Sequence, residues 1–276
     1  MEVAPGVHQL VFGERIYAGL PPPNVYLVVG SQSAVFIDTG YDREEDVKSR
    51  IGYWQALGSP KVAAVIVTHR HADHMGGAKG FHKATNAPII CAPDEQEIID
   101  SRLEGVATER TVSHSEVMDL GGTTLEFIHS PGHTMGCLSV LHKENSILFT
   151  GDTILGFGTT AVNPDEGDMT LYIETLRLYL TYDVKMICPG HGPVINTPEA
   201  KIHGLIEHRI ARETQILGLL EKGHLTIEDL FNEIYPEIEG GLANAARRQI
   251  QTHLIKLERD NKVQVLEDAK AYTLTR

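Results

Sequence analysis

The sequence is short of cysteine, of basic residues and of long hydrophobic runs. Its three cysteines, Cys91, Cys137 and Cys188, are odd in number and widely spaced, which argues against a disulfide framework. No apolar run is long enough to cross a bilayer, and the first residues lack the basic segment and apolar core of a secretion signal. These absences predict a cytoplasmic protein with reduced thiols and no membrane partner.

Positive charge is scarce as well. The 24 Lys and Arg are outnumbered by 37 Asp and Glu, which gives a formal net charge of -13 at pH 7. This balance argues against wholesale binding of a polyanion, although it says little about the fold. The hydrophobic fraction of 42% is ordinary for a globular chain and supplies enough material for a large core.

Histidine and aspartate are what the sequence concentrates. His69, His71, Asp73 and His74 form the pattern H-x-H-x-D-H directly after the apolar run at residues 62–67, which predicts a buried strand. On an extended segment His69, His71 and Asp73 would point the same way, while His74 would face elsewhere. Burying such groups without a cation carries a desolvation cost, so the cluster predicts a site for zinc or, with the same ligand chemistry, iron or manganese.

The same residue types follow three later strand-like segments. Apolar segments at 124–129, 147–150 and 184–188 precede His133, Asp152 and His191. With the cluster, these give five histidines and two aspartates, which is enough for two ions that share a carboxylate. We therefore expect all seven side chains to gather along one sheet edge.

Periodicity divides the chain near residue 200. Before it, strand-like segments such as 7–18 alternate with amphipathic helical patterns such as 44–57, which indicates an α/β fold. After it, three helical patterns and a final hairpin within 263–274 follow the order of a winged helix. We expect two domains, residues 1–200 and residues 201–276.

The third helical pattern of the C-terminal part has two faces. Its apolar stripe consists of Ala243, Ala246, Ile250, Leu254 and Leu257. The opposite side consists of Arg248, Thr252, Lys256 and Arg259. In a helix-turn-helix that outer face would meet nucleic acid. The alternative is a solvated surface or a packing module.

These motifs together resemble the metallo-β-lactamase superfamily, whose hallmark is H-x-H-x-D-H followed by a single His, a single Asp and a final His. The resemblance spans roughly residues 7–200 and implies a four-layer αβ/βα sandwich. Carried over position by position, it implies one ion held by His69, His71 and His133, a second held by Asp73, His74 and His191, and a bridge between them formed by Asp152.

Within the superfamily, the sequence is most similar to the β-lactamase-like protein 2 group, members of which act on single-stranded RNA and carry similar tails. The resemblance rests on GDTILGFGTT at 151–160, PGHGPVI at 189–195 and EHRIARETQIL at 207–217. After Gly132 the sequence departs from that group, which tends to have acidic or histidine residues there. Strongly hydrolytic zinc β-lactamases commonly carry a cysteine where Asp152 stands here, which argues against that activity.

The sequence thus predicts a hydrolase whose hydroxide is bridged by two divalent ions, with Asp73 orienting the hydroxide. Single-stranded RNA is the favoured substrate; the alternatives are a thioester, lactone or other small ester, as in glyoxalase II or lactonase relatives, or weak β-lactam hydrolysis. A non-catalytic metal-binding scaffold or sensor would require a blocked coordination site. Asn24, Tyr26, Thr159 and Thr160 are candidate substrate contacts, and the winged-helix tail is a candidate homodimer interface.

Overall fold

The computed structural model describes residues 1–13, 21–223, 225–266 and 270–275. They form two compact units. The first unit comprises Met1–Ser130, Met135–Thr160 and Asp183–Pro198, and the second comprises Pro131–Thr134, Ala161–Tyr182 and Glu199–Arg276. The expected boundary at residue 200 lies close to the last of these divisions. Residues 161–182, however, group with the C-terminal part.

A seven-stranded sheet forms the first half of the first unit. Its strands lie in chain order: β1 (Glu2–Ala4), β2 (Val7–Val11), β3 (Asn24–Val29), β4 (Ala34–Ile37), β5 (Val62–Ile66), β6 (Ile89–Cys91) and β7 (Arg110–Thr111). Strands β1 to β4 pair antiparallel, and β4 to β7 pair parallel. The expected strand at 7–18 ends at Val11, and residues 14–18 lie outside the described residues.

A five-stranded sheet forms the second half of the same unit. Its order is β12 (Met186–Pro189), β11 (Ile147–Gly151), β10 (Leu138–His142), β9 (Thr124–His129) and β8 (Val117–Asp119). Only β11 and β12 pair parallel in the described sheet; the other pairs are antiparallel. The carboxyl ends of β11 and β12 therefore meet at the same edge.

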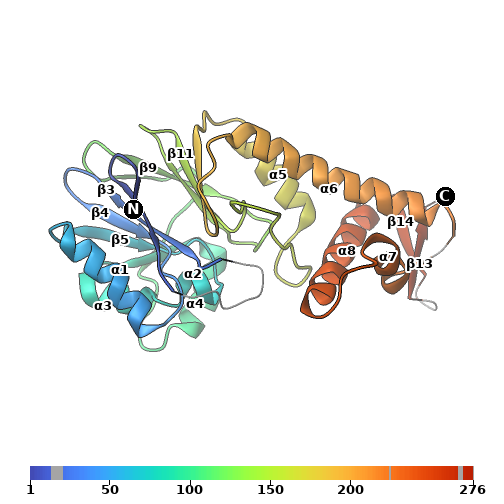
Figure 1. The fold of residues 1–276 in the computed structure, drawn as a ribbon, viewed down its shortest axis with the longest axis horizontal. Coiled ribbons are helices and arrows are strands. Elements are labelled where there is room, and N and C mark those ends of the chain that lie inside the picture. The colour runs from blue at the N-terminus through green and yellow to red at the C-terminus, as the bar shows by residue number, and fades with distance from the viewer. Residues whose placement is uncertain (14–20, 224, 267–269, 276) are drawn as a thin grey trace. The chain divides into compact units, whose positions relative to one another are not determined.

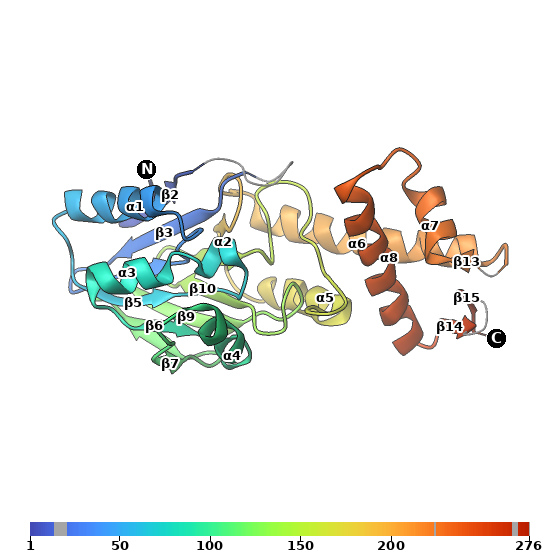
Figure 2. The same cartoon turned by 90° about the horizontal axis from the view of Figure 1, so that it is seen from below.

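The two sheets pack face to face around one apolar core. Val28 and Ile66 from the first sheet share it with Phe127 and Phe149 from the second, all of them buried. On its other face the first sheet is covered by helices, whose contacts include Phe36 with Phe81 at 4.7 Å between ring centroids. These helices are α1 (Glu44–Ala56), α3 (Ala78–Thr85) and α4 (Pro93–Arg102). Figures 1 and 2 show the resulting layers, with α1 and α3 on the outer side of the sheet.

The second unit combines helices with a small sheet. It contains α5 (Met169–Tyr179), most of α6 (Pro198–Leu220), β13 (Leu225–Thr226), α7 (Ile227–Ile234), α8 (Gly241–Arg259), β14 (Val263–Leu266) and β15 (Ala271–Leu274). The strand order is β13-β15-β14. Thr226 and Asp229 form the capping box of α7. The apolar stripe expected on α8 is buried against α6 and α7, so this part of the sequence reading is confirmed.

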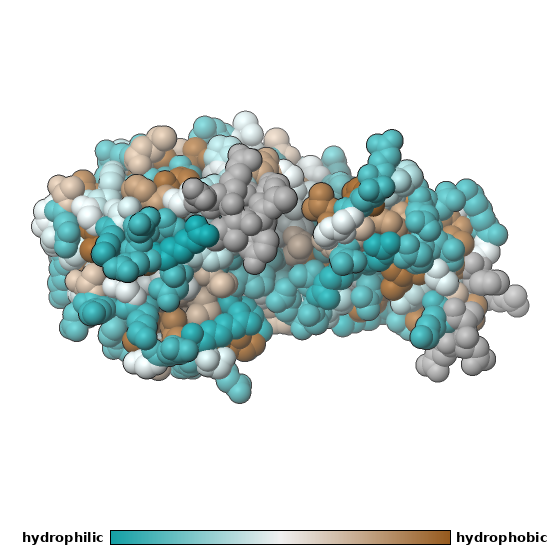
Figure 3. All heavy atoms as spheres, turned by 60° about the horizontal axis from the view of Figure 1, so that its bottom comes forward, coloured by the Kyte–Doolittle hydropathy of each residue, from teal (hydrophilic) through white to brown (hydrophobic). Residues whose placement is uncertain are grey.

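Large hydrophobic side chains are exposed only singly among the described residues. Examples are Val117, Phe157 and Leu242, which belong to different elements. On the face drawn in Figure 3, hydrophobic residues form small patches between hydrophilic ones. None of the described helices has the length and apolar character needed to span a membrane.

Candidate metal centre

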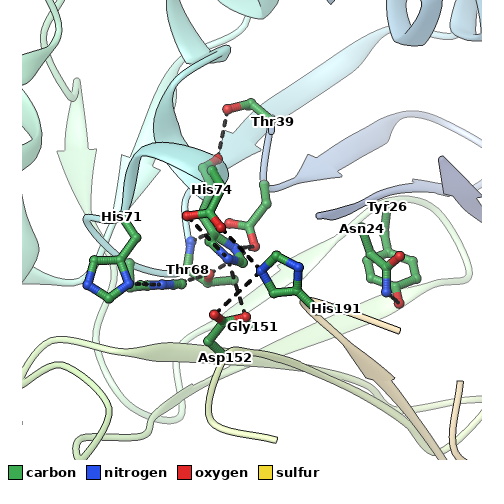
Figure 4. A network of polar contacts seen from close by, with 12 residues as sticks. Asn24, Tyr26, Thr39, Thr68, His71, His74, Gly151, Asp152 and His191 are labelled. Atoms are coloured by element: carbon green, nitrogen blue, oxygen red, sulfur yellow. Dashed lines mark hydrogen bonds and ion pairs between the residues drawn. The ribbon is translucent and has the colours of Figure 1, made fainter. Parts of the chain in front are cut away.

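The ligand-type residues stand where strands end, as the sequence indicated. His69 follows β5, Asp152 directly follows β11, and His191 follows β12. Because β11 and β12 are parallel neighbours, Asp152 and His191 leave the sheet on the same side. Figure 4 shows Asp152, His191 and His74 converging from separate elements.

The local path of the H-x-H-x-D-H segment differs from the expected one. The chain is extended at His71 (φ -71, ψ 144) and then enters the short helix α2 (Ala72–Met75). Asp73 and His74 are therefore helical, and the expected common direction of His69, His71 and Asp73 is wrong. A helical turn separates adjacent side chains by about 100° instead of about 180°. Both Asp73 and His74 consequently reach the same neighbour, His191.

Ligand-type atoms form three groups, in each of which all atoms lie within 4.8 Å of one another. The groups are His69 with His71 and His133, His69 with His74 and Asp152, and Asp73 with His74 and His191. Every residue named from the sequence as a metal ligand belongs to at least one group. That these residues bind metal stays a prediction. Metal binding requires the ligand atoms to lie close together, and they do.

The distances within these groups suit a shared cation. His74 Nε2 lies 3.3 Å from Asp152 Oδ1, while His191 Nε2 lies 3.2 Å from Asp73 Oδ2 and 3.6 Å from Asp152 Oδ2. The Nε2 atoms of His74 and His191 are buried and accept no hydrogen bond among the described residues. Buried polar atoms normally have a partner, so nitrogen atoms that face carboxylates in this way fit a divalent ion between them.

In His191 and His133 the other ring nitrogen, Nδ1, already makes a hydrogen bond. Nδ1 of His191 lies 2.9 Å from the carbonyl oxygen of Pro21, and Nδ1 of His133 lies 2.7 Å from that of Ala161. A carbonyl oxygen can only accept, so each Nδ1 carries the proton and each Nε2 keeps its lone pair. Such outer partners fix the tautomer and ring orientation that a metal ligand needs.

Asp38 is the outer partner that the sequence analysis missed. It follows β4, its backbone is left-handed (φ 61), and its Oδ2 lies 2.7 Å from His74 Nδ1. It also accepts hydrogen bonds from the backbone amide of Thr68 at 2.8 Å and its hydroxyl at 2.9 Å. That hydroxyl oxygen lies 3.0 Å from His69 Nδ1, which can donate to it. One signal for Asp38 was its place at the end of β4, the strand that pairs parallel with β5.

Charge concentrates around His74. Burial alone would lower the pKa of His74, but the carboxylates of Asp152, Asp38 and Asp73 outweigh it and raise that pKa well above 6.5. Burial would likewise raise the pKa of Asp73, but His74 and His191 hold it below 3.8. Asp73 therefore stays ionised at neutral pH. The site has the negative potential that a divalent cation requires.

A second buried carboxylate holds the H-x-H segment from the other side. Glu95 on α4 has no exposed surface and accepts from Arg70, the residue between His69 and His71. The bonds come from the Arg70 backbone amide at 2.8 Å and from its Nε and Nη2 at 2.7 and 3.0 Å. Glu95 also accepts from the amide of Gly136 at 3.1 Å. Glu95 thus joins two segments that carry ligand candidates.

Asn24 and Tyr26 have structural contacts that differ from the predicted substrate contacts. Both are buried. Asn24 Nδ2 donates to the carbonyl oxygens of Pro189 and Gly192, each at 2.8 Å, and the Tyr26 hydroxyl donates to Pro189 at 2.9 Å. Figure 4 draws them beyond His191, away from the other histidines. Their position indicates that they hold the turn that carries His191.

The two threonines after Asp152 occupy different environments. Thr159 is exposed on the loop, so it can still contact a substrate. Thr160 is 3% exposed, and its side chain is therefore largely inaccessible. The substrate role predicted for Thr159 stays a prediction, whereas burial argues against the same role for Thr160.

The basic face of α8, for which the sequence left nucleic-acid binding and a solvated or packing role open, makes contacts inside the second unit. Thr252 is 3% exposed and donates to the carbonyl oxygen of Val162 at 2.7 Å. The remaining pairs are Arg248 with Asn163 and Asp165, Lys256 with Glu213 and Asp260, and Arg259 with Asp168. These contacts favour the packing alternative, and nucleic-acid binding by this face stays a prediction. Helical spacing correctly separated the two faces, but both of them pack against other residues of the chain.

Comparisons with known proteins agree with this architecture. Residues 18–191 match the metallo-beta-lactamase superfamily, and residues 226–271 match the beta-lactamase associated winged helix domain. A beta-lactamase-like protein 2 homolog of Drosophila melanogaster is 31% identical over 266 residues, which cover 89% of this chain and 85% of that protein. An atrochrysone carboxyl ACP thioesterase of Aspergillus chevalieri is 26% identical over 276 residues, covering 95% of this chain and 83% of that protein.

Solved structures share the fold at lower sequence identity. A beta-lactamase domain protein of Burkholderia ambifaria superposes with a TM-score of 0.87 at 19% identity, over 99% of this chain and 93% of that chain. This likeness and the two family matches confirm the expected α/β sandwich with a C-terminal winged helix.

Proposed function

This chain belongs to the metallo-beta-lactamase superfamily, and we propose that it is a divalent-metal-dependent hydrolase that cleaves thioesters. Members of this superfamily are usually hydrolases, and the fold implies divalent metal ions. One observation carries the metal dependence: the buried, hydrogen-bond-free Nε2 atoms of His74 and His191 face the carboxylates of Asp73 and Asp152.

Zinc is the metal that we propose for this donor set. Imidazole nitrogens and carboxylate oxygens suit zinc, iron and manganese, and none of the three cysteines belongs to the groups of ligand-type atoms. Following the superfamily pattern, we propose His69, His71 and His133 for one ion, Asp73, His74 and His191 for the second, and Asp152 between them. Ions held there would lower the pKa of a coordinated water to about 7 and polarise a carbonyl oxygen.

The chain's own residues supply orientation and a proton acceptor. Hydrolysis adds water to the thioester carbonyl carbon, breaks the carbon–sulfur bond and releases a carboxylic acid and a thiol. Asp73 stays ionised at neutral pH, so its carboxylate can accept a hydrogen bond from the attacking water and hold it in line. Asp38 keeps the His74 ring from turning away from Asp73 and Asp152.

Two observations favour a thioester over RNA. The basic side chains that suggested an RNA-binding face are paired inside the second unit, and the net charge of -13 disfavours a long polyanion. A relative that aligns with 95% of this chain is named as an acyl carrier protein thioesterase. A single small ester needs no extended basic surface, so the thioester reading is compatible with the charge distribution.

Metal analysis combined with a substrate panel tests the proposal. We expect elemental analysis of purified protein to find close to two equivalents of zinc. We also expect hydrolysis of a short acyl thioester, detected by a thiol reagent, to fall at least ~100-fold in Asp152→Ala. The exposed Asp183→Asn variant serves as the control and should keep both metal and activity. Absence of bound transition metal, or full activity without Asp152, would refute the proposal.

Single-stranded RNA remains the second candidate because the curated relative with 31% identity belongs to the β-lactamase-like protein 2 group that the sequence resembles. The same panel should therefore include a labelled single-stranded RNA, together with a lactone and a β-lactam. Metal-dependent cleavage of RNA with no thioester turnover would replace the thioester proposal by this one.

A further inference from the structure

Arg50 is a charged residue that is buried inside the first unit. It lies on α1 and has no exposed surface. Its Nη2 donates to the carbonyl oxygen of Phe12 at 3.1 Å, while its Nε and Nη1 are buried and form no hydrogen bond with any described residue. Burial lowers the pKa of Arg50 to about 10, so the guanidinium stays charged at neutral pH. Buried polar groups normally have partners, so this cation requires an explanation.

The guanidinium of Arg50 packs against the backbone instead of pairing with a carboxylate. Among the described residues it forms no ion pair, although Asp46, one turn earlier on α1, attracts it. A Cβ built on Gly40 would lie 2.7 Å from Nη1 of Arg50 and 2.8 Å from Cζ and Nη2. The guanidinium therefore lies directly against Gly40, where no side chain fits between them. Because Arg50 is fully enclosed, it cannot move aside without displacing its neighbours.

Gly40 belongs to the turn that holds His74. The carboxylate of Asp38 lies 2.7 Å from His74 Nδ1. The backbone amide and the hydroxyl of Thr39 both donate to the carbonyl oxygen of His74, each at 2.8 Å, and Figure 4 shows the hydroxyl contact. The carbonyl oxygen of Gly40 accepts from the amide of Gly77 at 2.9 Å. Three consecutive residues thus fix the ring of His74, its backbone and the chain that follows α2.

The same turn has an unusual backbone. Asp38 and Gly40 are both left-handed, with φ of 61 and 75. Backbones of this kind persist where the surrounding structure enforces them. The contact with Arg50 on one residue of the turn and the hydrogen bonds to His74 from its two neighbours supply that enforcement.

We propose that Arg50 is a positioning residue of the metal centre: its buried guanidinium holds the turn of residues 38–40, and this turn orients His74. That the orientation serves metal binding rests on the proposed function. Arg50 forms no hydrogen bond with any of the described ligand candidates, so it acts through the turn alone. The planar guanidinium suits this role, because it can pack against one stretch of backbone while it donates to another, at Phe12.

Gly40→Ala and Gly58→Ala form a matched pair that tests the contact. Both glycines are left-handed, with φ of 75 and 88, so alanine strains both turns. Only the new Cβ at position 40 would meet the guanidinium, since nothing lies within 4 Å of a Cβ at position 58. We expect Gly40→Ala to bind zinc about 10-fold more weakly than Gly58→Ala in competition with a chromophoric chelator. Equal affinities of the two variants would overturn the proposal.

Arg50→Met tests the side chain itself. It should also weaken zinc binding about 10-fold, whereas Lys48→Met, at an exposed position of the same helix, should not change it. The double variant Gly40→Ala/Arg50→Met should bind zinc no more weakly than the weaker single variant, because residues in contact do not act additively. Losses that simply multiply, or equal effects of Arg50→Met and Lys48→Met, would contradict the proposal. Should Arg50→Met fail to fold, the two glycine variants decide alone.

A proton signal separates this inference from the proposed function. The Nδ1 proton of His74 faces the Asp38 carboxylate across 2.7 Å, and such a proton gives a downfield NMR signal with or without bound metal. In purified protein we expect Gly58→Ala to keep this signal and both Gly40→Ala and Arg50→Met to shift or lose it. If the signal responds in this way but even the wild type binds no zinc, positioning by Arg50 stands and the metal-dependent function fails. If zinc binds and neither the signal nor the affinity responds, the role of Arg50 alone is refuted.

Discussion

Nδ1 of His74 lies 2.7 Å from Oδ2 of Asp38, and both side chains are buried. The same carboxylate accepts two hydrogen bonds from Thr68, whose hydroxyl oxygen contacts His69. One aspartate at the end of β4 thus orients two imidazoles that belong to different proposed ions. This arrangement explains how a short helix and an extended segment keep a common ligand geometry.

Asp38→Asn should weaken zinc binding by about 10- to 100-fold, the range observed when outer partners of metal ligands are removed. The Asn side chain is uncharged and cannot accept hydrogen bonds from both Thr68 and His74 as the carboxylate does. The His74 ring therefore loses its fixed tautomer. Competition with a chromophoric chelator measures the affinity. Asp42→Asn, on the same loop and exposed, is the matched control and should bind zinc as the wild type does. Equal affinities for the two variants would contradict the role of Asp38.

Glu95→Gln should lower the free energy of unfolding by about 2 to 4 kcal/mol, because it leaves the largely buried Arg70 guanidinium without its charge partner. Urea denaturation monitored by circular dichroism gives this value. Glu97→Gln on the same helix is the control, since Glu97 is exposed and should tolerate the change. Zinc affinity should fall in the first variant alone, because Arg70 separates His69 from His71. A stable Glu95→Gln protein with unchanged zinc affinity would show that Glu95 is dispensable.

Asp168→Asn should destabilise the second unit by about 0.5 kcal/mol at pH 7, because Asn caps a helix as well as Asp and only the contribution of the charge is lost. Asp168 caps α5 through Thr170 and Leu171 and pairs with Arg259. Burial alone would raise its pKa, but the Leu171 amide and Arg259 outweigh burial and lower that pKa below 3.8.

The sign of the pH dependence follows from that lowered pKa. The ionised Asp168 stabilises the fold above pH 3.8, and this contribution is lost as the pH falls through the folded-state pKa. The difference in unfolding free energy between wild type and Asp168→Asn should therefore shrink below pH 4 in urea titrations. If this difference in unfolding free energy grew as the pH fell, the stabilising role of ionised Asp168 would be contradicted. The control variant Asp183→Asn should unfold with the same free energy as the wild type both at pH 7 and below pH 4.

Thr252→Val should cost about 1 kcal/mol of stability, because the Val162 carbonyl oxygen loses one of its two donors, Thr252 and Gln249. Thermal or urea unfolding measures the change. Thr214→Val, exposed on α6, is the control. If both variants were equally stable, the packing role inferred for this face of α8 would be contradicted.

All three cysteines should resist iodoacetamide in the native protein at pH 8. Each is buried, and burial raises the pKa of the Cys91 thiol to about 12, so the reactive thiolate is scarce. Mass spectrometry should find no adduct before unfolding in urea and three afterwards. The raised pKa also means that stability falls as pH rises from about 9 towards 12, because only the unfolded thiol ionises in that range. Rapid native labelling at Cys91 would contradict the burial.

The sequence alone determined which residues could act as metal ligands and which strands they follow. Apolar runs followed at once by His or Asp place those side chains at strand ends, since a strand's carboxyl terminus and the next residue are covalently adjacent. The apolar stripe of α8 was equally local, because helical spacing fixes which of its residues share a face. Both predictions depended only on residues that lie within a few positions of one another in the sequence.

The tertiary structure decided everything that depends on partners far apart in the chain. Asn24 meets Pro189 across 165 positions, and Asp38 meets His74 across 36, so neither contact leaves a periodic signal in the sequence. Thr252 is polar and was read as outward-facing, yet it is buried against Val162, 90 positions away. The hydropathy of a residue indicates whether its side chain prefers water or the protein interior. Which residues the side chain contacts depends on how the whole chain packs.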